Sequence, residues 1–105
     1  MLAARRPRSF VVFISLLSYS REIADDDPLH RAHVAFVVEH INASRFLSAG
    51  KRPGINGGCL IVYGDDEQET RALLDQDPYV IDGVATYELH HVTVSLADPK
   101  SSLAG

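Results

Sequence analysis

Histidine is the residue type in this chain that most clearly points to chemistry, because an imidazole exchanges protons near neutral pH. The sequence places five of them at His30, His33, His40, His90 and His91. His33 and His40 lie seven residues apart in an amphipathic segment, and both fall within its apolar stripe. A polar group buried alone costs free energy, so an imidazole in that stripe needs a partner or a function.

A metal site is one chemistry that these histidines could serve. His30 and His33 are three residues apart on one helix face, and Asp77 would complete a set of three ligands. None of the histidine spacings matches a standard zinc motif. The single cysteine, Cys59, excludes a multi-cysteine zinc or iron–sulfur site within one chain. We therefore predict that the protein holds no metal and no cofactor.

Length and charge limit the other classes of function. The chain has 105 residues, of which 46% are hydrophobic and 23% charged, as expected for one globular domain. Its net charge of −4 gives it no overall attraction to nucleic acid or to an anionic membrane, so we predict neither as a partner. With one cysteine and no possible intrachain disulfide, a cytoplasmic protein is expected.

The N-terminal segment has two interpretations. Residues 1–20 are basic, then apolar, then small, which resembles a secretory signal peptide. The apolar run is also rich in β-branched and aromatic residues, which favours a buried strand over residues 9–19. We favour the strand, with 1–8 as a flexible extension, 9–96 as the domain and 97–105 as a C-terminal tail.

Two helices and four strands are expected to position the histidines. Asp27 and Pro28 are typical of a helix start, and the apolar spacing predicts a helix from there to about Asn42. Its apolar stripe consists of Leu29, Ala32, Phe36, Val37 and Ile41. Further strands are predicted over 45–49, 59–63 and 84–96, with a glycine-rich loop over 50–58 and a second helix from about 66 to before 77.

This β-α-β-β-α-β order predicts an α+β, ferredoxin-like fold with a four-stranded antiparallel sheet. Both helices would then cover the same face of the sheet. The first strand is apolar on both of its faces, so the other face of the sheet should be apolar as well. Because an apolar face of that size is unfavourable in water, we predict a homodimer that packs through the open sheet face.

Two segments resemble a known family. The stretch from His33 to Gly50 is similar to the YciI-like, or YCII-related, pattern, with the basic residue Arg31 shortly before the histidine. Asp77-Pro78-Tyr79 followed by Gly83-Val84 is similar to that family's second motif. The resemblance covers about residues 9–95. Ser44 stands where the pattern has a glycine, and Lys51 where it has a proline; Asn42 or Ala43 would adapt the helix end to the first change.

The resemblance implies a fold of the dimeric α/β-barrel superfamily, shared with muconolactone isomerases and some small monooxygenases. A few relatives act on small ring compounds, including removal of halide from chlorinated hydroquinones. The family's active-site pair would fall on His33 and Asp77. The carboxylate would hold the imidazole in one tautomer while the imidazole takes and returns a proton.

The same residues also have structural interpretations. Asp77 precedes a proline and could cap a helical turn, and His33 could bond a backbone carbonyl. Arg31, Ser48 and Tyr79 are candidates for binding the substrate, although Arg31 lies on the polar side of its helix and Tyr79 could be a core aromatic.

We therefore expect a small cofactor-independent enzyme. It would use His33 and Asp77 for acid–base chemistry, such as isomerisation, elimination or dehydrohalogenation, on a small ring or carbonyl compound. The alternative is a non-catalytic dimeric module that binds a small molecule or serves as an accessory subunit. In that case His33 and Asp77 would serve the structure alone.

Overall fold

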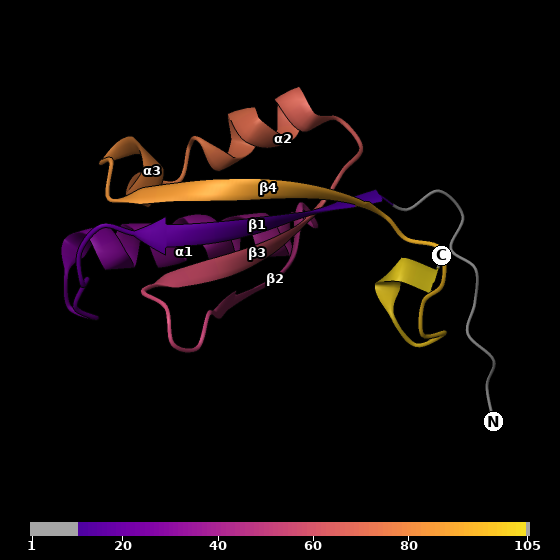
Figure 1. Cartoon of the computed structure of the whole chain (residues 1–105), viewed down its shortest axis with the longest axis horizontal. Coiled ribbons are helices and arrows are strands. Elements are labelled where there is room, and N and C mark those ends of the chain that lie inside the picture. The colour runs from indigo at the N-terminus through magenta and orange to yellow at the C-terminus, as the bar shows by residue number, and fades with distance from the viewer. Residues whose placement is uncertain (1–10, 105) are drawn as a thin grey trace.

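A computed structural model describes residues 11–104 of the chain (Figure 1). Its elements follow the predicted β-α-β-β-α-β order with a short extra helix before the last strand. The strands are β1 (Val11–Tyr19), β2 (Phe46–Lys51), β3 (Gly57–Tyr63) and β4 (Ala85–Thr93). The helices are α1 (Pro28–Asn42), α2 (Glu67–Leu74), α3 (Pro78–Ile81) and the 3-10 turn η1 (Ser102–Ala104).

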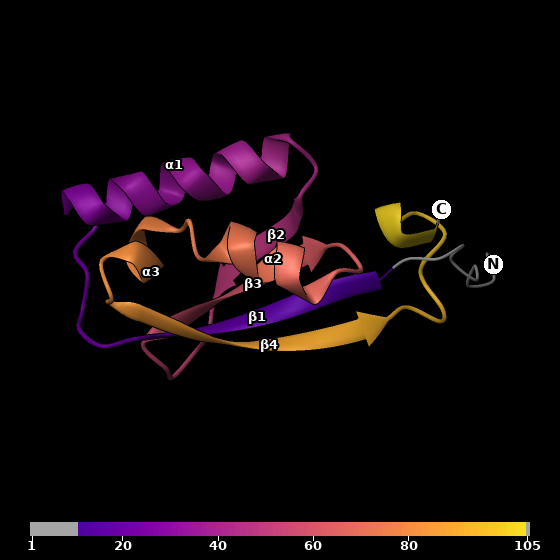
Figure 2. The same cartoon turned by 90° about the horizontal axis from the view of Figure 1, so that it is seen from above.

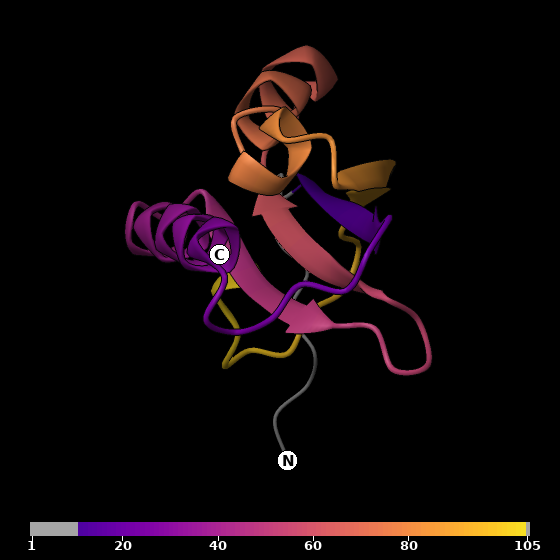
Figure 3. The ribbon, with the colours of Figure 1, turned by 90° about the vertical axis from the view of Figure 1, so that its left-hand side faces the viewer.

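The four strands form one antiparallel sheet in the order β2-β3-β1-β4. This is the ferredoxin-like arrangement that the element order predicts, so the fold class is confirmed. All three α-helices lie on one side of the sheet, as Figures 2 and 3 show from two directions. Among residues 11–104 no α-helix lies on the opposite side of β1, β3 and β4, which we call the helix-free face.

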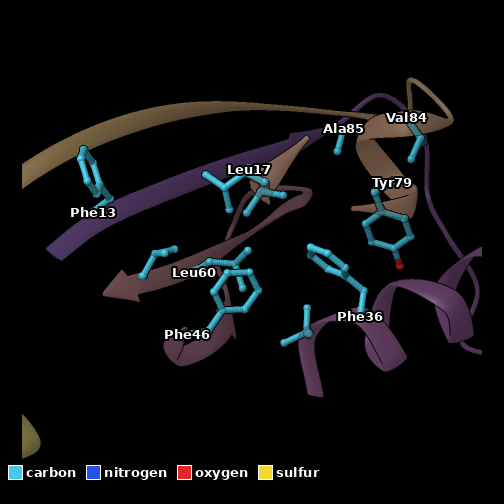
Figure 4. Close-up of a cluster of buried hydrophobic side chains, with 11 residues drawn as sticks. Phe13, Leu17, Phe36, Phe46, Leu60, Tyr79, Val84 and Ala85 are labelled. Carbon is cyan, nitrogen blue, oxygen red and sulfur yellow. The ribbon is translucent and has the colours of Figure 1, made fainter. Parts of the chain in front are cut away.

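The hydrophobic core fills the space between the sheet and the helices (Figure 4). From β1 it receives Phe13 and Leu17, which alternate with side chains on the open face of the sheet. Its members from β1, α1, β2, β3, α2, α3 and the start of β4 are Phe13, Leu17, Phe36, Val37, Phe46, Leu60, Val62, Leu74, Tyr79, Val84 and Ala85.

Helix α1 begins and packs largely as predicted, with one difference. Asp27 caps it by accepting a hydrogen bond from the backbone N–H of Leu29, and Pro28 occupies the first helical position. The buried positions of the helix include Phe36 and Val37. Its inward face is rotated relative to our prediction, however, because the predicted stripe members Ala32 and Ile41 are exposed.

Two histidines occupy part of the inward face of α1, from which Ala32 and Ile41 are turned away. His33 is half-buried and His40 is buried, at 7% exposed. Two imidazoles of α1 therefore lie beside the buried apolar side chains of that helix.

The predicted loop over 50–58 is wrong at both ends, because β2 extends to Lys51 and β3 begins at Gly57. Gly57 pairs with Ser18 inside the sheet. A Cβ atom at position 57 would lie 2.0 Å from the carbonyl oxygen of Leu17, closer than any real contact. Glycine is therefore required at position 57 because two strands approach closely there, not because the chain turns. A sequence pattern does not distinguish these two reasons for a glycine.

The end of α1 also differs from expectation. Ser44 itself adopts a left-handed backbone conformation, with φ of 58°, and neither Asn42 nor Ala43 takes its place. The backbone N–H of Ser44 donates to the carbonyl of Ile41, and that of Arg45 donates to His40. This is the helix end that normally favours glycine, so the serine adopts the conformation at a cost in free energy.

The helix-free face of the sheet is apolar along its centre. Val12 is buried there, and Ile14 and Leu16 beside it are half-buried on β1. Their cross-strand neighbours on β3 include Cys59 and Ile61, both half-buried. The face predicted from the first strand is therefore present.

Candidate active site

His33 and Asp77 meet although 44 residues separate them in sequence. His33 lies in the middle of α1 and Asp77 directly precedes α3, two elements that pack together. The Nδ1–H group of His33 donates to the carboxylate of Asp77, at 2.8 Å from Oδ1 and 3.0 Å from Oδ2. Because a carboxylate only accepts, this bond assigns the proton of neutral His33 to Nδ1 and leaves Nε2 as the basic atom.

Asp77 has a structural role as well. Its Oδ1 atom also accepts a hydrogen bond from the backbone N–H of Tyr79 at 2.9 Å, which makes Asp77 the N-cap of α3. Pro78 follows at the first helical position. The side chain is only 1% exposed, so these hydrogen bonds are what stabilise its charge in the interior. The capping and histidine-pairing interpretations of Asp77 both hold in this geometry.

Tyr79 joins the pair to two further side chains. Its ring stacks on the His33 imidazole, with centroids 3.9 Å apart and an interplanar angle of 5°. Its hydroxyl is hydrogen-bonded to Nδ1 of His30 at 2.9 Å. Tyr19 from β1 meets the Tyr79 ring edge-on, with centroids 5.2 Å apart.

Both tyrosines are held in the neutral form. Burial, together with the neighbouring Tyr19 and Asp77, raises the pKa of Tyr79 to about 12. Burial and then the negative charge of Asp77 raise the pKa of Tyr19. Near neutral pH the Tyr79 hydroxyl is therefore a hydrogen-bonding group rather than a source of protons.

A cavity of about 480 Å³ opens beside this cluster, between α1 and the loop that joins β2 to β3. His30, His33 and Tyr79 line it, and so do large apolar side chains that are exposed to solvent: Val34, Val38 and Ile55. The Nε2 atom of His33 makes no hydrogen bond among the described residues and is not fully buried. The free base of the pair is thus accessible to a small molecule.

The sequence-predicted substrate-binding residues divide into two groups. Tyr79 lines the cavity, whereas Arg31 and Ser48 do not. Arg31 is exposed on α1. Ser48 is exposed and pairs with Ile61 in the register of the helix-free face, away from His33. The structure therefore does not bring Arg31 or Ser48 together with the histidine–aspartate pair.

Two basic side chains also line the cavity. Lys51 and Arg52 line it from the end of β2 and the loop after it. Arg52 is half-buried, and its guanidinium donates to the carbonyl of Leu17 at 3.2 Å. Among the described residues, the one carboxylate that lines the same cavity belongs to Asp25, whose side chain is almost fully exposed.

His30 is the site residue that sequence reasoning missed in this role. Its spacing to His33 suggested metal ligation, but in the structure His30 bonds Tyr79 and His33 bonds Asp77. Within residues 11–104 no group of three histidine, cysteine or acidic side chains is placed to hold a metal ion. The sequence signal that could have placed His30 in the site was its spacing. His30 lies one helical turn before His33, and residues three apart share a helix face.

His40 provides a second buried imidazole with different surroundings. Its Nδ1 atom accepts a hydrogen bond from the guanidinium of Arg45 at 3.2 Å. Its ring packs against Phe36 and Phe46, with centroid distances of 4.5 and 5.2 Å. Glu39 approaches its other nitrogen to 3.8 Å.

Comparison with protein families identifies the family of this chain. Residues 12–93 match the model of the YCII-related domain family. The chain belongs to that family. The match covers most of the chain, so it confirms the resemblance seen in the His33 and Asp77 segments. No curated protein matches the sequence. In the part of this YCII-related protein that the structure describes, no helix is long and apolar enough to cross a membrane.

Proposed function

We propose that this YCII-related protein is a cofactor-independent acid–base enzyme that acts on a small ring or carbonyl compound. The observation that carries the proposal is the His33–Asp77 hydrogen bond, which leaves Nε2 of the imidazole without a partner among the described residues, in a side chain that lines an open cavity. A buried carboxylate on one nitrogen and free space at the other is the arrangement that general base catalysis requires.

The reaction begins when Nε2 of His33 removes a proton from a carbon of the substrate. The electron pair moves into the conjugated system of the substrate, and Asp77 stabilises the positive charge on the imidazole. His33 then returns the proton to a different carbon, which gives isomerisation. Alternatively, a leaving group departs with the electron pair, which gives elimination or dehydrohalogenation.

The cavity lining supports a substrate with one apolar part and one anionic part. Val34, Val38 and Ile55 give the cavity an apolar lining, and Lys51 and Arg52 add positive charge to it. An arginine binds a carboxylate or phenolate oxygen strongly because its N–H groups are fixed in direction.

The proposal includes a homodimer formed through the helix-free face of the sheet. The supporting observation is the half-buried apolar centre of that face, with Ile14 and Leu16 beside Ile61. Sedimentation equilibrium should give twice the chain mass for the native protein. Ile61→Lys, which puts a charge in the centre of the face, should give a monomer, whereas a native monomer would contradict the dimer.

Proton exchange in D₂O tests the catalytic proposal without knowledge of the natural substrate. A panel of small ketones, unsaturated lactones and hydroxylated aromatic acids is incubated with the protein, and loss of C–H signals is followed by ¹H NMR. We expect at least one compound to exchange faster with the native protein than with His33→Gln.

The same variant distinguishes the non-catalytic alternative. If His33 serves only the structure, no compound should exchange faster with the native protein, and His33→Gln should lower the thermal midpoint. If His33 is catalytic, the variant should lose exchange while its thermal midpoint is unchanged or rises, because active sites often sacrifice stability for function. His40→Gln, on the same helix but outside the cavity, is the matched control.

A further inference from the structure

The cavity contains a second hydrogen-bonded pair, formed by Tyr79 and His30. The hydroxyl oxygen of Tyr79 lies 2.9 Å from Nδ1 of His30, and both residues line the cavity beside His33. Figure 4 shows the Tyr79 ring with its hydroxyl directed toward α1, the helix that carries both histidines. The side chain of His30 is 29% exposed, so it can exchange protons with solvent.

The protonation state of His30 decides what the Tyr79 hydroxyl can do. When Nδ1 of His30 has no proton, it accepts the hydrogen of the hydroxyl, and only the oxygen lone pairs of Tyr79 face other groups. When Nδ1 carries a proton, it donates to the phenol oxygen, and the O–H of Tyr79 is free to donate to a ligand.

The position of Tyr79 relative to His33 gives this donor a use. The two rings are stacked almost parallel, 3.9 Å apart, so one small planar molecule can contact the edges of both. Removing a proton from carbon places negative charge on a conjugated oxygen of the substrate. A hydrogen-bond donor held at that oxygen stabilises the charge as it develops.

We propose that Tyr79, with His30 as its positioning residue, binds the substrate oxygen that becomes negatively charged when His33 removes a proton. The substrate class is then a planar compound in which a C–H bond is conjugated to a carbonyl or ring oxygen. This inference rests on the proposed function, because it assigns the second group needed by that reaction.

The step balances without an added reactant. The C–H bond breaks, its proton goes to Nε2 of His33, and its electron pair forms an enolate or phenolate. The oxygen accepts a hydrogen bond from Tyr79 but takes no proton from it. The neutral form in which Tyr79 is held suits a donor that keeps its own hydrogen.

Several titratable or charged groups surround His30 and have to be separated in a test. They come from α1, the loop before it, β1, the segment that starts α3, and the end of β2 with its following loop: His33, Asp25, Tyr19, Asp77, Tyr79, Lys51 and Arg52. Of these, Asp25 lies 4.0 Å from Nε2 of His30.

The test measures binding of 2,4-dinitrophenolate, a planar aromatic oxyanion that stays ionised well below neutral pH. Its visible absorption reports binding directly, and the titration is repeated from mildly alkaline to mildly acidic pH. We expect the native protein to bind more tightly as the pH falls. Tyr79→Phe should bind about tenfold or more weakly at the acidic end, the loss expected for one hydrogen bond to a charged group.

His30→Gln should remove the part of the pH dependence that needs the Tyr79 hydroxyl, so that its affinity at the acidic end falls to that of Tyr79→Phe, whereas His33→Gln should keep that part. A structural role of His30 would not predict that difference, since both residues lie on α1 and line the same cavity. His30 is partly exposed, so this variant keeps the proposal testable if Tyr79→Phe fails to fold.

Three results would overturn the inference: no binding by the native protein, native affinity in Tyr79→Phe, or an unchanged pH dependence in His30→Gln. Failure of the proposed function is seen separately, as the absence of His33-dependent exchange in D₂O. A protein that binds the phenolate through Tyr79 but exchanges no C–H bond would be a binding module rather than an enzyme.

Discussion

His33 and His40 lie two turns apart on the same side of α1, yet their partners have opposite charge. His33 meets the carboxylate of Asp77 and faces a cavity. His40 meets the guanidinium of Arg45 and packs between two phenylalanine rings. An arginine only donates, so it requires a neutral His40 whose Nδ1 accepts. The carboxylate of Asp77 instead accepts, so Nδ1 of His33 carries the proton.

The difference shows that the position of an imidazole in an apolar stripe does not by itself indicate whether its role is chemical or structural. Each of these two satisfies one nitrogen with a charged partner. What separates them is the charge of the partner on Nδ1, and whether the histidine lines the cavity, where a ligand could approach its other nitrogen. His33 is equipped for proton transfer, and His40 for connecting the end of α1 to the start of β2.

The largest expected effect is on C–H exchange by a responsive compound from the D₂O panel. His33→Gln should lower the exchange rate by about 100- to 10,000-fold, the usual contribution of a positioned general base. His40→Gln should change it less than about threefold, because His40 does not line the cavity. Equal losses in the two variants would remove the distinction between the histidines.

The second effect concerns stability at the two histidine partners. Asp77→Ala removes the acceptor for both His33 and the start of α3, and should lower the free energy of unfolding by about 3 kcal/mol. Arg45→Ala removes an exposed guanidinium and should cost less than about 1 kcal/mol. Urea unfolding at one protein concentration compares them. If Arg45→Ala lowered the free energy of unfolding more than Asp77→Ala, then Arg45 and not Asp77 would be the partner that matters more for stability.

The third effect is a dependence of stability on alkaline pH, to which Tyr79 at the His33 end contributes. The folded protein holds the phenol proton of Tyr79 more tightly than the unfolded chain, with a pKa of about 12 against 10.0. The resulting stability is complete below pH 10 and is lost as the pH rises toward 12, by up to about 2 kcal/mol.

Urea unfolding at a series of alkaline pH values measures this slope. It should be shallower in Tyr79→Phe, and the slope that stays should come from Tyr19 and Tyr87, whose pKa values burial also raises. His40→Gln, by contrast, should keep the native slope. An unchanged slope in Tyr79→Phe would show that this phenol is not shielded in the folded protein.

The smallest expected effect is on stability at Ser44, just after the end of α1 that carries His40. Ser44→Gly should stabilise the protein by about 0.5–1 kcal/mol, because glycine adopts the left-handed conformation there without a Cβ clash. Ser44→Ala, which also has a Cβ atom, is the matched control and should give no such gain. Exchange in D₂O should be the same in all three proteins, since Ser44 does not line the cavity.

The order of the elements was predictable because strand and helix periodicities and the Asp-Pro helix start are local signals. The partnership of His33 with Asp77 came from a family resemblance, since no local pattern connects residues 44 positions apart. The exposure of Ala32 shows the limit of periodicity, because the rotation of α1 is decided by what it packs against.

The rest of the site depends on three-dimensional contacts that leave no mark in the sequence. The stacking of Tyr79 on His33 and its bond to His30 require the exact docking of α3 on α1. Gly57 lies beside a carbonyl oxygen of a strand far away in the chain. A turn and a close strand approach both select glycine, so its presence alone could not distinguish them.

The two bonds accepted by one oxygen of Asp77 have a consequence for divergence among related sequences. The Oδ1 atom supports the backbone of α3 as well as the ring of His33. A descendant that has lost the chemistry would still be selected to keep an aspartate there, because α3 needs its cap. It would have no such reason to keep the histidine. Among homologues, the residue type at position 33, rather than at position 77, should therefore distinguish proteins that keep the proposed chemistry from proteins that have lost it.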